Sequence, residues 1–541
     1  MDGPSWLEVG PVSAARGSLT RAALAAFCLI LMAAGSVFAQ ASAAGFKVIR
    51  FDSSDGRSEP DSTTAAESSV LALVPDLLLA DESHISAPVP AQGVDAWGVK
   101  RNWGLAIGEV VAVNNVVWLF NEYIRGAAFT QVNPRSWYNN IKTGFVWDDN
   151  HFTTNMFAHP YHGSMYYSAA RSNGFNYWQS APFAIAGSFM WECCGETHPM
   201  SSNDWIATSI GGIAIGETFY RLSGTVLDNT ATGSERTWRE IGALLISPLR
   251  GFNRLVSGRW SEVGPNPDER MPSSMSNQLS AGVRVVGEGK SIDDSTQTNA
   301  FFEVDYAFGS PFSSENRKPF DFFLMSLQVN FSEKQTLGRL QIQGNLWTKD
   351  LKVSDKVHHA FTLTQDYDYM NNFAYEFGGQ SFAGSLNTRW LFSENWHLRT
   401  DLSLYWMLMG AVNSDFAFIA EFPPEFDQER LREYDFGTGG GPALGAALTL
   451  KGRDVLALRY RLTYLKTLNG SINEGDDAHH YVHWLFVRGR VPISRGFGVG
   501  ADAGVFLRDS YYTCDVCDDY VQQRNPQIRL YGVWQVGREG F

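Results

Sequence analysis

The second half of the chain, from about Leu279 to Val536, is a succession of segments in which apolar and polar side chains alternate. In Phe323–Phe331 one face carries Phe, Met, Leu, Val and Phe, and the other carries Leu, Ser, Gln and Asn. Successive side chains of a strand point to opposite faces, so one face requires an apolar environment and the other requires water. Several segments run to about ten residues or more, the length that a tilted strand needs to cross a bilayer.

This pattern predicts an antiparallel outer-membrane β-barrel of about twelve strands over residues 261–541. A second clear example is Trp396–Trp406, in which Leu402 and Leu404 share one face and Arg399 and Asp401 the other. A soluble β-sandwich is the alternative, but it would need its outward Trp and Phe side chains to be covered. In the first example, we expect one row of side chains to face lipid: Phe323, Met325, Leu327, Val329 and Phe331.

The N-terminus predicts export. Arg16 and Arg21 precede an apolar run over residues 22–34, and small-residue sites follow at 37–39 and 41–43. These features are typical of a secretory signal peptide, assigned to residues 1–43, and the alternative is an anchor that is never cleaved. Residues 44–100 are rich in Ser, Asp, Glu, Ala and Pro and are predicted to form a disordered periplasmic linker.

The C-terminal residue and the net charge of the chain indicate which partners the protein has. Phe541, which follows an alternating strand, resembles the signal that the barrel-assembly machinery reads. The formal charge of −14 argues against nucleic acid, and the sequence indicates no cofactor. We therefore expect a protein of the Gram-negative outer membrane that contacts outer-membrane lipid, with its oligomeric state left open. Since no run of about 20 apolar residues follows the signal, no helical membrane span is expected.

Residues 101–260 form a different region, predicted to be a helical domain. Helices are expected near 104–125, 165–171, 183–194, 204–222 and 238–258. They are apolar on most sides but carry scattered polar residues, which is typical of helices buried against protein. A plug in the barrel lumen, or a periplasmic cap beneath it, would provide such a site. Gly212 and Gly216 have the spacing for close contact between helices.

The last predicted helix carries the one basic patch of this acidic chain, with Arg239, Arg250 and Arg254 beside several leucines. Pro248 is expected to interrupt it. Two interpretations remain open: an amphipathic helix on the inner leaflet of the membrane, and a helix packed on the barrel with its arginines extended toward water.

The densest run of unusual residues begins with Gly-Phe-Val-Trp-Asp at 144–148 and continues with His-Pro-Tyr-His-Gly-Ser at 159–164. Trp191-Glu192, Asn203-Asp204-Trp205 and Gly216-Glu217 follow. Over about residues 100–225 the chain resembles an uncharacterised bacterial domain of unknown function found ahead of outer-membrane barrels. The resemblance implies location and architecture and carries no activity.

Two chemical sites are possible in this run. His159 and His162 are three residues apart and, with Glu192, Glu196 or His198, could bind a metal ion; Pro160 argues against helical geometry at His159. Alternatively, His159 or His162 could activate Ser164, with Asp148, Asp149 or Asp204 orienting the imidazole. We expect the simplest interpretation to hold, in which these polar side chains tie the helices together.

After removal of the signal, four cysteines remain. A bond between the neighbours Cys193 and Cys194 would be strained, so we expect both to stay reduced. Cys514 and Cys517 lie in a long loop before the last strand and are expected to form a disulfide in an oxidising environment.

These observations favour an outer-membrane barrel that is not an enzyme and that serves transport, structure or envelope organisation. The alternative is an outer-membrane hydrolase that acts on lipid or cell wall through the cluster at residues 159–164. A channel would need charge along an open lumen, and five side chains are candidates: Arg389, Arg399, Asp401, Arg459 and Arg461.

Overall fold

The structure is a computed structural model of the chain. It describes residues 93–541 except 149, 273, 289–294, 314–317, 332–334, 415–432, 469–476, 495, 515–516 and 539–541. The predicted signal peptide and residues 44–92 of the predicted linker lie outside the described residues. The end of the linker is packed on the helical domain, where the ring of Trp97 lies 4.3 Å from the guanidinium carbon of Arg250.

Helices occupy the chain from Trp103 to Val256. Helices are present at the five predicted positions, with bounds that differ from those predicted, and the last predicted helix is divided into two at Pro248, as expected. In chain order they are α3 (Trp103–Phe120), the π-helical turn η1 (Asn121–Arg125), η2 (Ala128–Thr130), α4 (Pro134–Thr143), η3 (Thr154–Ala158), α5 (His159–Ser172), α6 (Tyr177–Cys194), α7 (Ser202–Ile206), η4 (Ala207–Gly211), α8 (Gly212–Val226), α9 (Gly233–Ile246), α10 (Pro248–Val256) and η5 (Asp268–Arg270), with the short parallel pair β1 (Phe145–Val146) and β2 (Met200–Ser201) among them.

The prediction of a twelve-stranded antiparallel barrel is confirmed. The strands close in the ring order β10-β11-β12-β13-β14-β3-β4-β5-β6-β7-β8-β9. Their bounds are β3 (Met275–Glu288), β4 (Ser295–Phe308), β5 (Phe323–Asn330), β6 (Leu337–Lys352), β7 (Val357–Asn371), β8 (Glu376–Leu391), β9 (Trp396–Asn413), β10 (Tyr434–Leu450), β11 (Arg453–Thr467), β12 (Asp477–Ser494), β13 (Phe497–Cys514) and β14 (Cys517–Arg538).

Alternation along β4 separates the outer wall of the barrel from its interior. Phe302 is exposed, whereas Glu303 is fully buried and contacts arginines of other strands. Because neighbouring side chains point to opposite faces, Tyr306 and Phe308 belong to the outer wall with Phe302. The same rule on β9 places Leu402, Leu404 and Trp406 outside, where all three are exposed, as the sequence predicts.

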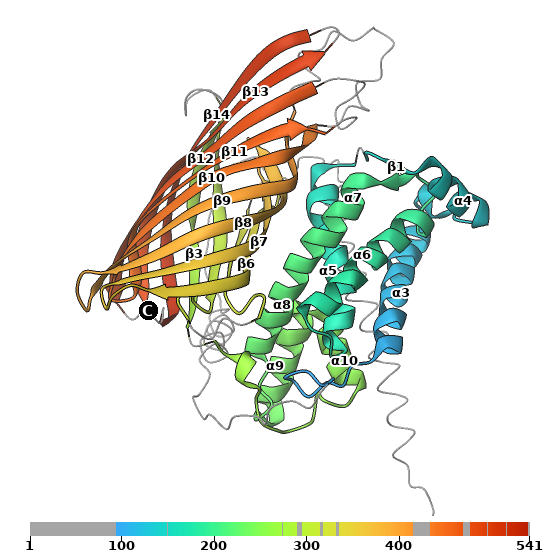
Figure 1. Cartoon of the computed structure of the whole chain (residues 1–541), viewed down its shortest axis with the longest axis horizontal. Helices are drawn as coiled ribbons and strands as arrows, with labels where there is room; N and C mark the ends of the chain where they lie inside the picture. The colour runs from blue at the N-terminus through green and yellow to red at the C-terminus, as the bar shows by residue number, and fades with distance from the viewer. Residues whose placement is uncertain are drawn as a thin grey trace, which may run out of the picture.

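The helical domain precedes the barrel, as expected, but it lies against the outer wall rather than in the lumen or beneath the barrel (Figure 1). Tyr306, Phe308 and their outward neighbours on the next strands are buried because α5, α6, η4 and α8 cover them. The sequence shows that the helices need a protein surface, but it does not say which one. An aromatic outer wall on strands β4 to β10 provides it.

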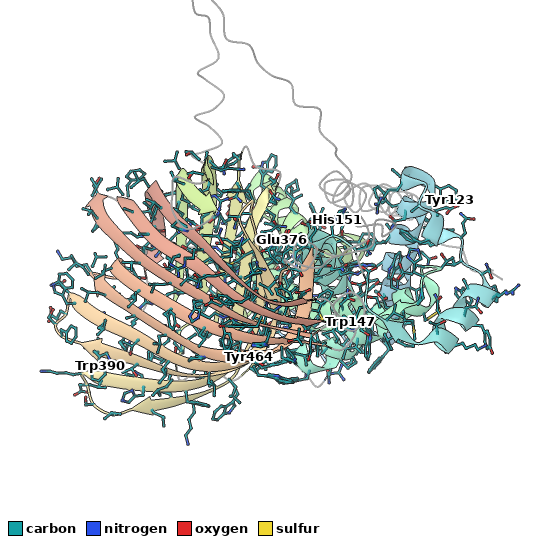
Figure 2. The ribbon with its side chains drawn as sticks, turned by 90° about the horizontal axis from the view of Figure 1, so that it is seen from above. Tyr123, Trp147, His151, Glu376, Trp390 and Tyr464 are labelled. Carbon is teal, nitrogen blue, oxygen red and sulfur yellow. A yellow bond between two sulfur atoms is a disulfide. The ribbon has the colours of Figure 1, made fainter. Side chains whose placement is uncertain are left out.

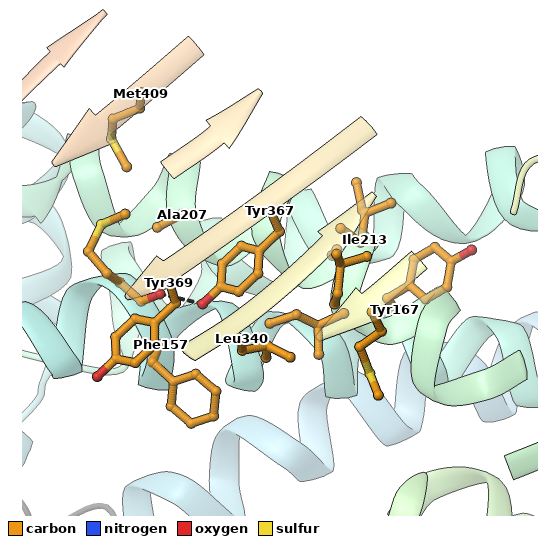
Figure 3. Close-up of a cluster of buried hydrophobic side chains, with 14 of the residues drawn as sticks. Phe157, Tyr167, Ala207, Ile213, Leu340, Tyr367, Tyr369 and Met409 are labelled. Carbon is orange, nitrogen blue, oxygen red and sulfur yellow. Dashed lines mark hydrogen bonds between the residues drawn. The ribbon is translucent and has the colours of Figure 1, made fainter. Parts of the chain in front are cut away.

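Side chains from the two parts interleave in one apolar cluster (Figure 3). Phe157, Tyr167, Ala207 and Ile213 come from the helices, and Leu340, Tyr367, Tyr369 and Met409 come from the barrel. Polar contacts fix the register of the two surfaces. The hydroxyl of Thr153 lies 3.1 Å from that of Tyr369, the amide of Asn155 donates to the Tyr434 hydroxyl at 2.7 Å, and Gln365 donates to the carbonyl of Ile210 at 2.8 Å.

The expected lipid-facing row on β5 therefore requires a correction. Phe323 and Met325 point outward, as predicted, but the helical domain covers them. Phe331, beyond the end of β5, is exposed. The sequence argues against a helical membrane span, but among the described residues one helix, Trp103–Arg125, has the length and composition to cross a membrane.

The interior of the barrel is occupied by the barrel's own side chains. Tyr375, just before β8, stacks on Phe506 of β13 with 4.2 Å between the ring centroids, five strands away around the ring. Below them, Arg461 of β11 pairs with Asp368 of β7 at 2.6 Å. Arg529 is almost completely buried and contacts carboxylates on β4 and β13.

The packing against the outer wall yields a prediction. Ile342→Ala removes a side chain buried under the helices and should weaken docking by about 2–5 kcal/mol, the usual cost of emptying such a position. Hydrogen exchange of the α8 amides in the folded protein should accelerate accordingly. Leu404→Ala, on the uncovered wall, is the matched control and should leave that exchange unchanged; equal effects of the two variants would contradict this docking surface.

Candidate functional site

The motif residues are brought together by a close crossing of two helical segments. A Cβ atom on Gly163 of α5 would lie 1.8 Å from the carbonyl oxygen of Thr208 in η4, and one on Gly212 would lie 2.7 Å from the Cα of Gly163. Only glycine permits this approach. The expectation that Gly212 serves close helix contact is confirmed, and the crossing holds α5 against η4, the turn that follows α7.

His159, Glu192 and Asp204 meet at one end of the helical domain. They come from the first residue of α5, the last turn of α6 and the short helix α7. One potential ligand atom from each lies within 4.8 Å of the other two. His159 Nε2 lies 3.7 Å from Asp204 Oδ1. Sequence reasoning placed His159 and Glu192 together in a metal set and assigned Asp204 to a separate catalytic set.

Backbone and amide groups hold the two carboxylates in place. Glu192 Oε2 accepts a hydrogen bond from the backbone N–H of Ser201 at 2.9 Å, and Asp204 Oδ1 accepts one from the side chain of Asn203 at 2.8 Å. Asn203 also accepts the backbone N–H of Asp148 at 2.8 Å, which brings the start of the motif to the same place. Burial raises the pKa of Asp204 to about 6, against the lowering effect of His159 nearby.

The other predicted site residues make separate contacts. His162 Nε2 lies 2.9 Å from the hydroxyl of Tyr166, and its ring packs edge-on against Trp191. The hydroxyl of Ser164 donates to the carbonyl of Tyr161 at 2.6 Å. His198 packs against Phe129. Asp149 lies outside the described residues.

The helical geometry at His159 was not anticipated. α5 includes Pro160 although helical residues precede it in the π-helical turn η3. Pro160 has no N–H to donate, and the carbonyl of Met156, four residues earlier, accepts a hydrogen bond from the Tyr367 hydroxyl instead. The turn η3 leads directly into α5, so His159 and His162 do lie on one helix.

The expectation that Cys193 and Cys194 stay reduced is contradicted, since their sulfur atoms are bonded. In the structure, α4 holds the end of α6: Trp137 donates to the carbonyl of Cys194 at 3.0 Å and Asn140 to that of Cys193 at 3.3 Å.

The predicted disulfide between Cys514 and Cys517 stays a prediction. The two residues are backbone partners where β13 turns into β14, and their side chains lie outside the described part of the chain.

Sequence reasoning missed the ion-pair centre of the helical domain. Glu217 on α8 is fully buried and accepts hydrogen bonds from Arg171 at 2.7 Å and from Arg221 at 2.9 Å. Arg221 extends to Asp321 of the barrel at 3.0 Å. The spacing of Glu217 and Arg221 by four residues in an apolar helix was the available signal.

The basic patch is also internal to the protein. Arg236 and Arg254 both pair with Glu240, and Arg250 lies 4.0 Å from the ring centroid of Tyr220. The arginines thus join α9 and α10 to the rest of the helical domain, and they do not form an exposed basic face.

Together these features define a class of protein: a closed β-barrel that carries a helical domain on its outer wall, with a histidine–carboxylate cluster in that domain. Residues 144–249, within the helical domain, match the model of the family described as "Domain of unknown function (DUF3943)". No curated protein matches the chain.

Solved structures similar to the barrel include outer-membrane porins and channels. The NanC porin has 9% identity and a TM-score of 0.22, covering 48% of this chain and 98% of its own. An outer membrane channel from Pseudomonas putida F1 has 9% identity and a TM-score of 0.26, covering 49% and 96%. The TodX monoaromatic hydrocarbon channel, as a deltaS2 mutant, has 8% identity and a TM-score of 0.22, covering 50% and 91%.

The contacts of His162 give a stability prediction. His162→Ala leaves the buried hydroxyl of Tyr166 with one partner fewer and should lower the free energy of unfolding of the helical domain by about 1–3 kcal/mol. Ser164→Ala loses one local bond and should cost no more than about 1 kcal/mol. Urea unfolding monitored by tryptophan fluorescence compares them. A larger loss for Ser164→Ala than for His162→Ala would contradict the structural role of His162.

Proposed function

We propose that this chain is a protein of the outer membrane in which the barrel is a closed scaffold and the helical domain shares the bilayer with it. The observation that carries this proposal is the position of the helices on the outer wall. In a membrane barrel that wall faces lipid. A domain that docks on the outer wall along several neighbouring strands lies in the same bilayer as the barrel, unless the exterior of the domain is polar.

One exterior face of the helical domain, formed by α3 and α6, is apolar. On α3 the exposed side chains include Leu105, Ile107 and Val111, and on α6 they include Ile185 and Phe189. Glu109, the one charged residue of α3, is buried and accepts a hydrogen bond from Asn173 at 2.9 Å. An exposed helix face without charge is favourable in lipid and costly in water.

The dimensions of this face fit a bilayer. α3 and α6 each have 18 residues, which corresponds to about 27 Å, close to the roughly 30 Å hydrocarbon core. Exposed Trp103 and Trp178 lie at the starts of α3 and α6, and exposed Trp137 and Tyr138 on α4 lie by the opposite end of α6. Aromatic residues at two levels are typical of the two membrane interfaces.

Figure 2 shows the helical domain against the barrel from above. Trp147, His151 and Glu376 lie where the helices meet the barrel, and Trp390 lies on the part of the barrel wall away from the helices. On the side where β3 begins and β14 ends, four of the five connections between strands have four residues or fewer, whereas the longest connection, 414–433, is on the other side. We assign the first side to the periplasm. The candidate site is then at the external side, because Thr153 and Asn155 contact Tyr369 and Tyr434 beside the β7–β8 and β9–β10 connections.

A scaffold role is favoured over transport by the occupied lumen. Arg461, one of the residues expected to line a channel, instead pairs with Asp368, and Arg399 pairs with Asp454 at 2.7 Å. Buried ion pairs that are satisfied in this way resist separation, because breaking one leaves an uncompensated charge. The barrel therefore holds the helical domain in place and does not conduct.

Conductance tests this scaffold role. Purified protein in planar lipid bilayers should show no steady single-channel conductance at low voltage. The double variant Tyr375→Ala/Phe506→Ala removes the stacked pair that crosses the lumen and should raise ion leakage, whereas Leu404→Ala on the outer wall should not. A stable open channel in the unaltered protein would overturn the closed scaffold.

The position of the helical domain in lipid is tested separately. Ile185→Arg should lower stability in phospholipid vesicles by about 2.5–3.5 kcal/mol if this residue lies near the midplane. Thr237→Arg, at an exposed position of α9 outside the apolar face, is the control and should have little effect. Equal tolerance of the two arginines would place the helical domain in water.

A further inference from the structure

We propose that His159, Glu192 and Asp204 bind a divalent first-row transition metal ion. This inference goes beyond the scaffold function and does not require it, since the three ligands all belong to the helical domain.

The spacing of the three side chains fits one ion. Nitrogen and oxygen ligands lie about 2.0–2.2 Å from such a metal, so any two of them are at most roughly 4.4 Å apart. His159 Nε2 and Asp204 Oδ1 are already 3.7 Å apart, and all three ligand atoms lie within 4.8 Å of one another. Movement of the side chains by a few tenths of an ångström would bring the three ligand atoms within reach of one metal ion.

Glu192 provides an independent indication of a missing cation. Its side chain is 0% exposed, and among the described residues its Oε1 has no hydrogen-bond partner. A buried carboxylate oxygen without a partner is costly. The carboxyl groups of Asp204, Glu196 and Asp148 are among the groups that act electrostatically on Glu192. A metal ion would satisfy the free oxygen and offset the negative charge of these groups.

The imidazole of His159 is oriented for ligation. Its Nδ1 lies 3.3 Å from the hydroxyl of Thr208, which leaves Nε2 directed at Asp204. Ligating histidines usually have their second nitrogen fixed in this way. The His159 side chain keeps 15% of its surface exposed, so an ion can reach the site from solvent.

The ligand types restrict the choice of metal. Imidazole with two carboxylates suits Mn²⁺, Fe²⁺, Co²⁺ or Zn²⁺. Magnesium and calcium prefer sites made of oxygen atoms alone, and soft ions such as Cu⁺ prefer sulfur. Asp148, which is half-buried and tied to Asn203, is placed to support the ion or a water molecule bound to it.

The experiment uses the full-length protein, refolded in detergent, stripped with EDTA and dialysed. Titration with Co²⁺ should produce visible d–d absorption that saturates at one equivalent per chain, and Zn²⁺ should displace it. Glu192→Gln and His159→Ala should each weaken Co²⁺ binding at least tenfold. His198→Ala removes an exposed histidine outside the cluster and is the matched control, with unchanged binding expected.

Two results would overturn the proposal: no saturable Co²⁺ spectrum in the unaltered protein, or unchanged affinity in both ligand variants. Folding of each variant is checked by its heat-modifiable migration in gels and by hydrogen exchange of α5 and α6. Should Glu192→Gln fail to fold, His159→Ala decides the outcome, because this partly exposed side chain can be removed with less disturbance. Neither result depends on whether the barrel conducts.

Discussion

The aromatic outer wall of strands β4 to β10 is the constraint on which the arrangement of this protein depends. The pleat directs Phe308, Phe323, Tyr367 and Phe436 outward, where a barrel in a membrane would present them to lipid. The helical domain covers them instead, and Trp147 stacks on Phe436 at 5.3 Å. Tyrosines on this wall add hydroxyl groups, which need partners that lipid cannot supply. A protein surface with amides and carbonyls at matching positions supplies them.

The ion pairs show how the same physical requirement is met in two places. Inside the helical domain, Glu217 is shared between Arg171 and Arg221, and Arg221 reaches Asp321 of the barrel. Inside the barrel, Glu303 is shared among Arg339, Arg488 and Arg529. In each case a buried carboxylate is surrounded by guanidinium groups that satisfy its oxygens. Among the described residues, no arginine pairs with His159, Glu192 or Asp204, and this difference separates their cluster from the structural ion pairs.

Local signals in the sequence were sufficient for the elements and for some contacts. Alternation gave the strands, their number and their outward sides, as Leu402 and Leu404 illustrate. Glycine spacing indicated the close crossing at Gly212. Expectations based on pairs of neighbouring residues were less successful. Pro160 did not prevent a helix, because the turn η3 leads into it. Cys193 and Cys194 are bonded to each other at the end of α6, which α4 holds in place.

By itself, the sequence determined that this chain has a closed barrel and a polar-dotted helical domain, since periodicity is a property of each segment. It also selected most members of the candidate site. Only the tertiary structure decided where the helical domain docks and that His159, Glu192 and Asp204 converge. The docking depends on how two surfaces distant in sequence match in shape and hydrogen bonding. The convergence depends on the close crossing at Gly163, which holds α5 against the turn after α7, and on the hydrogen bond from Ser201 that holds Glu192 of α6.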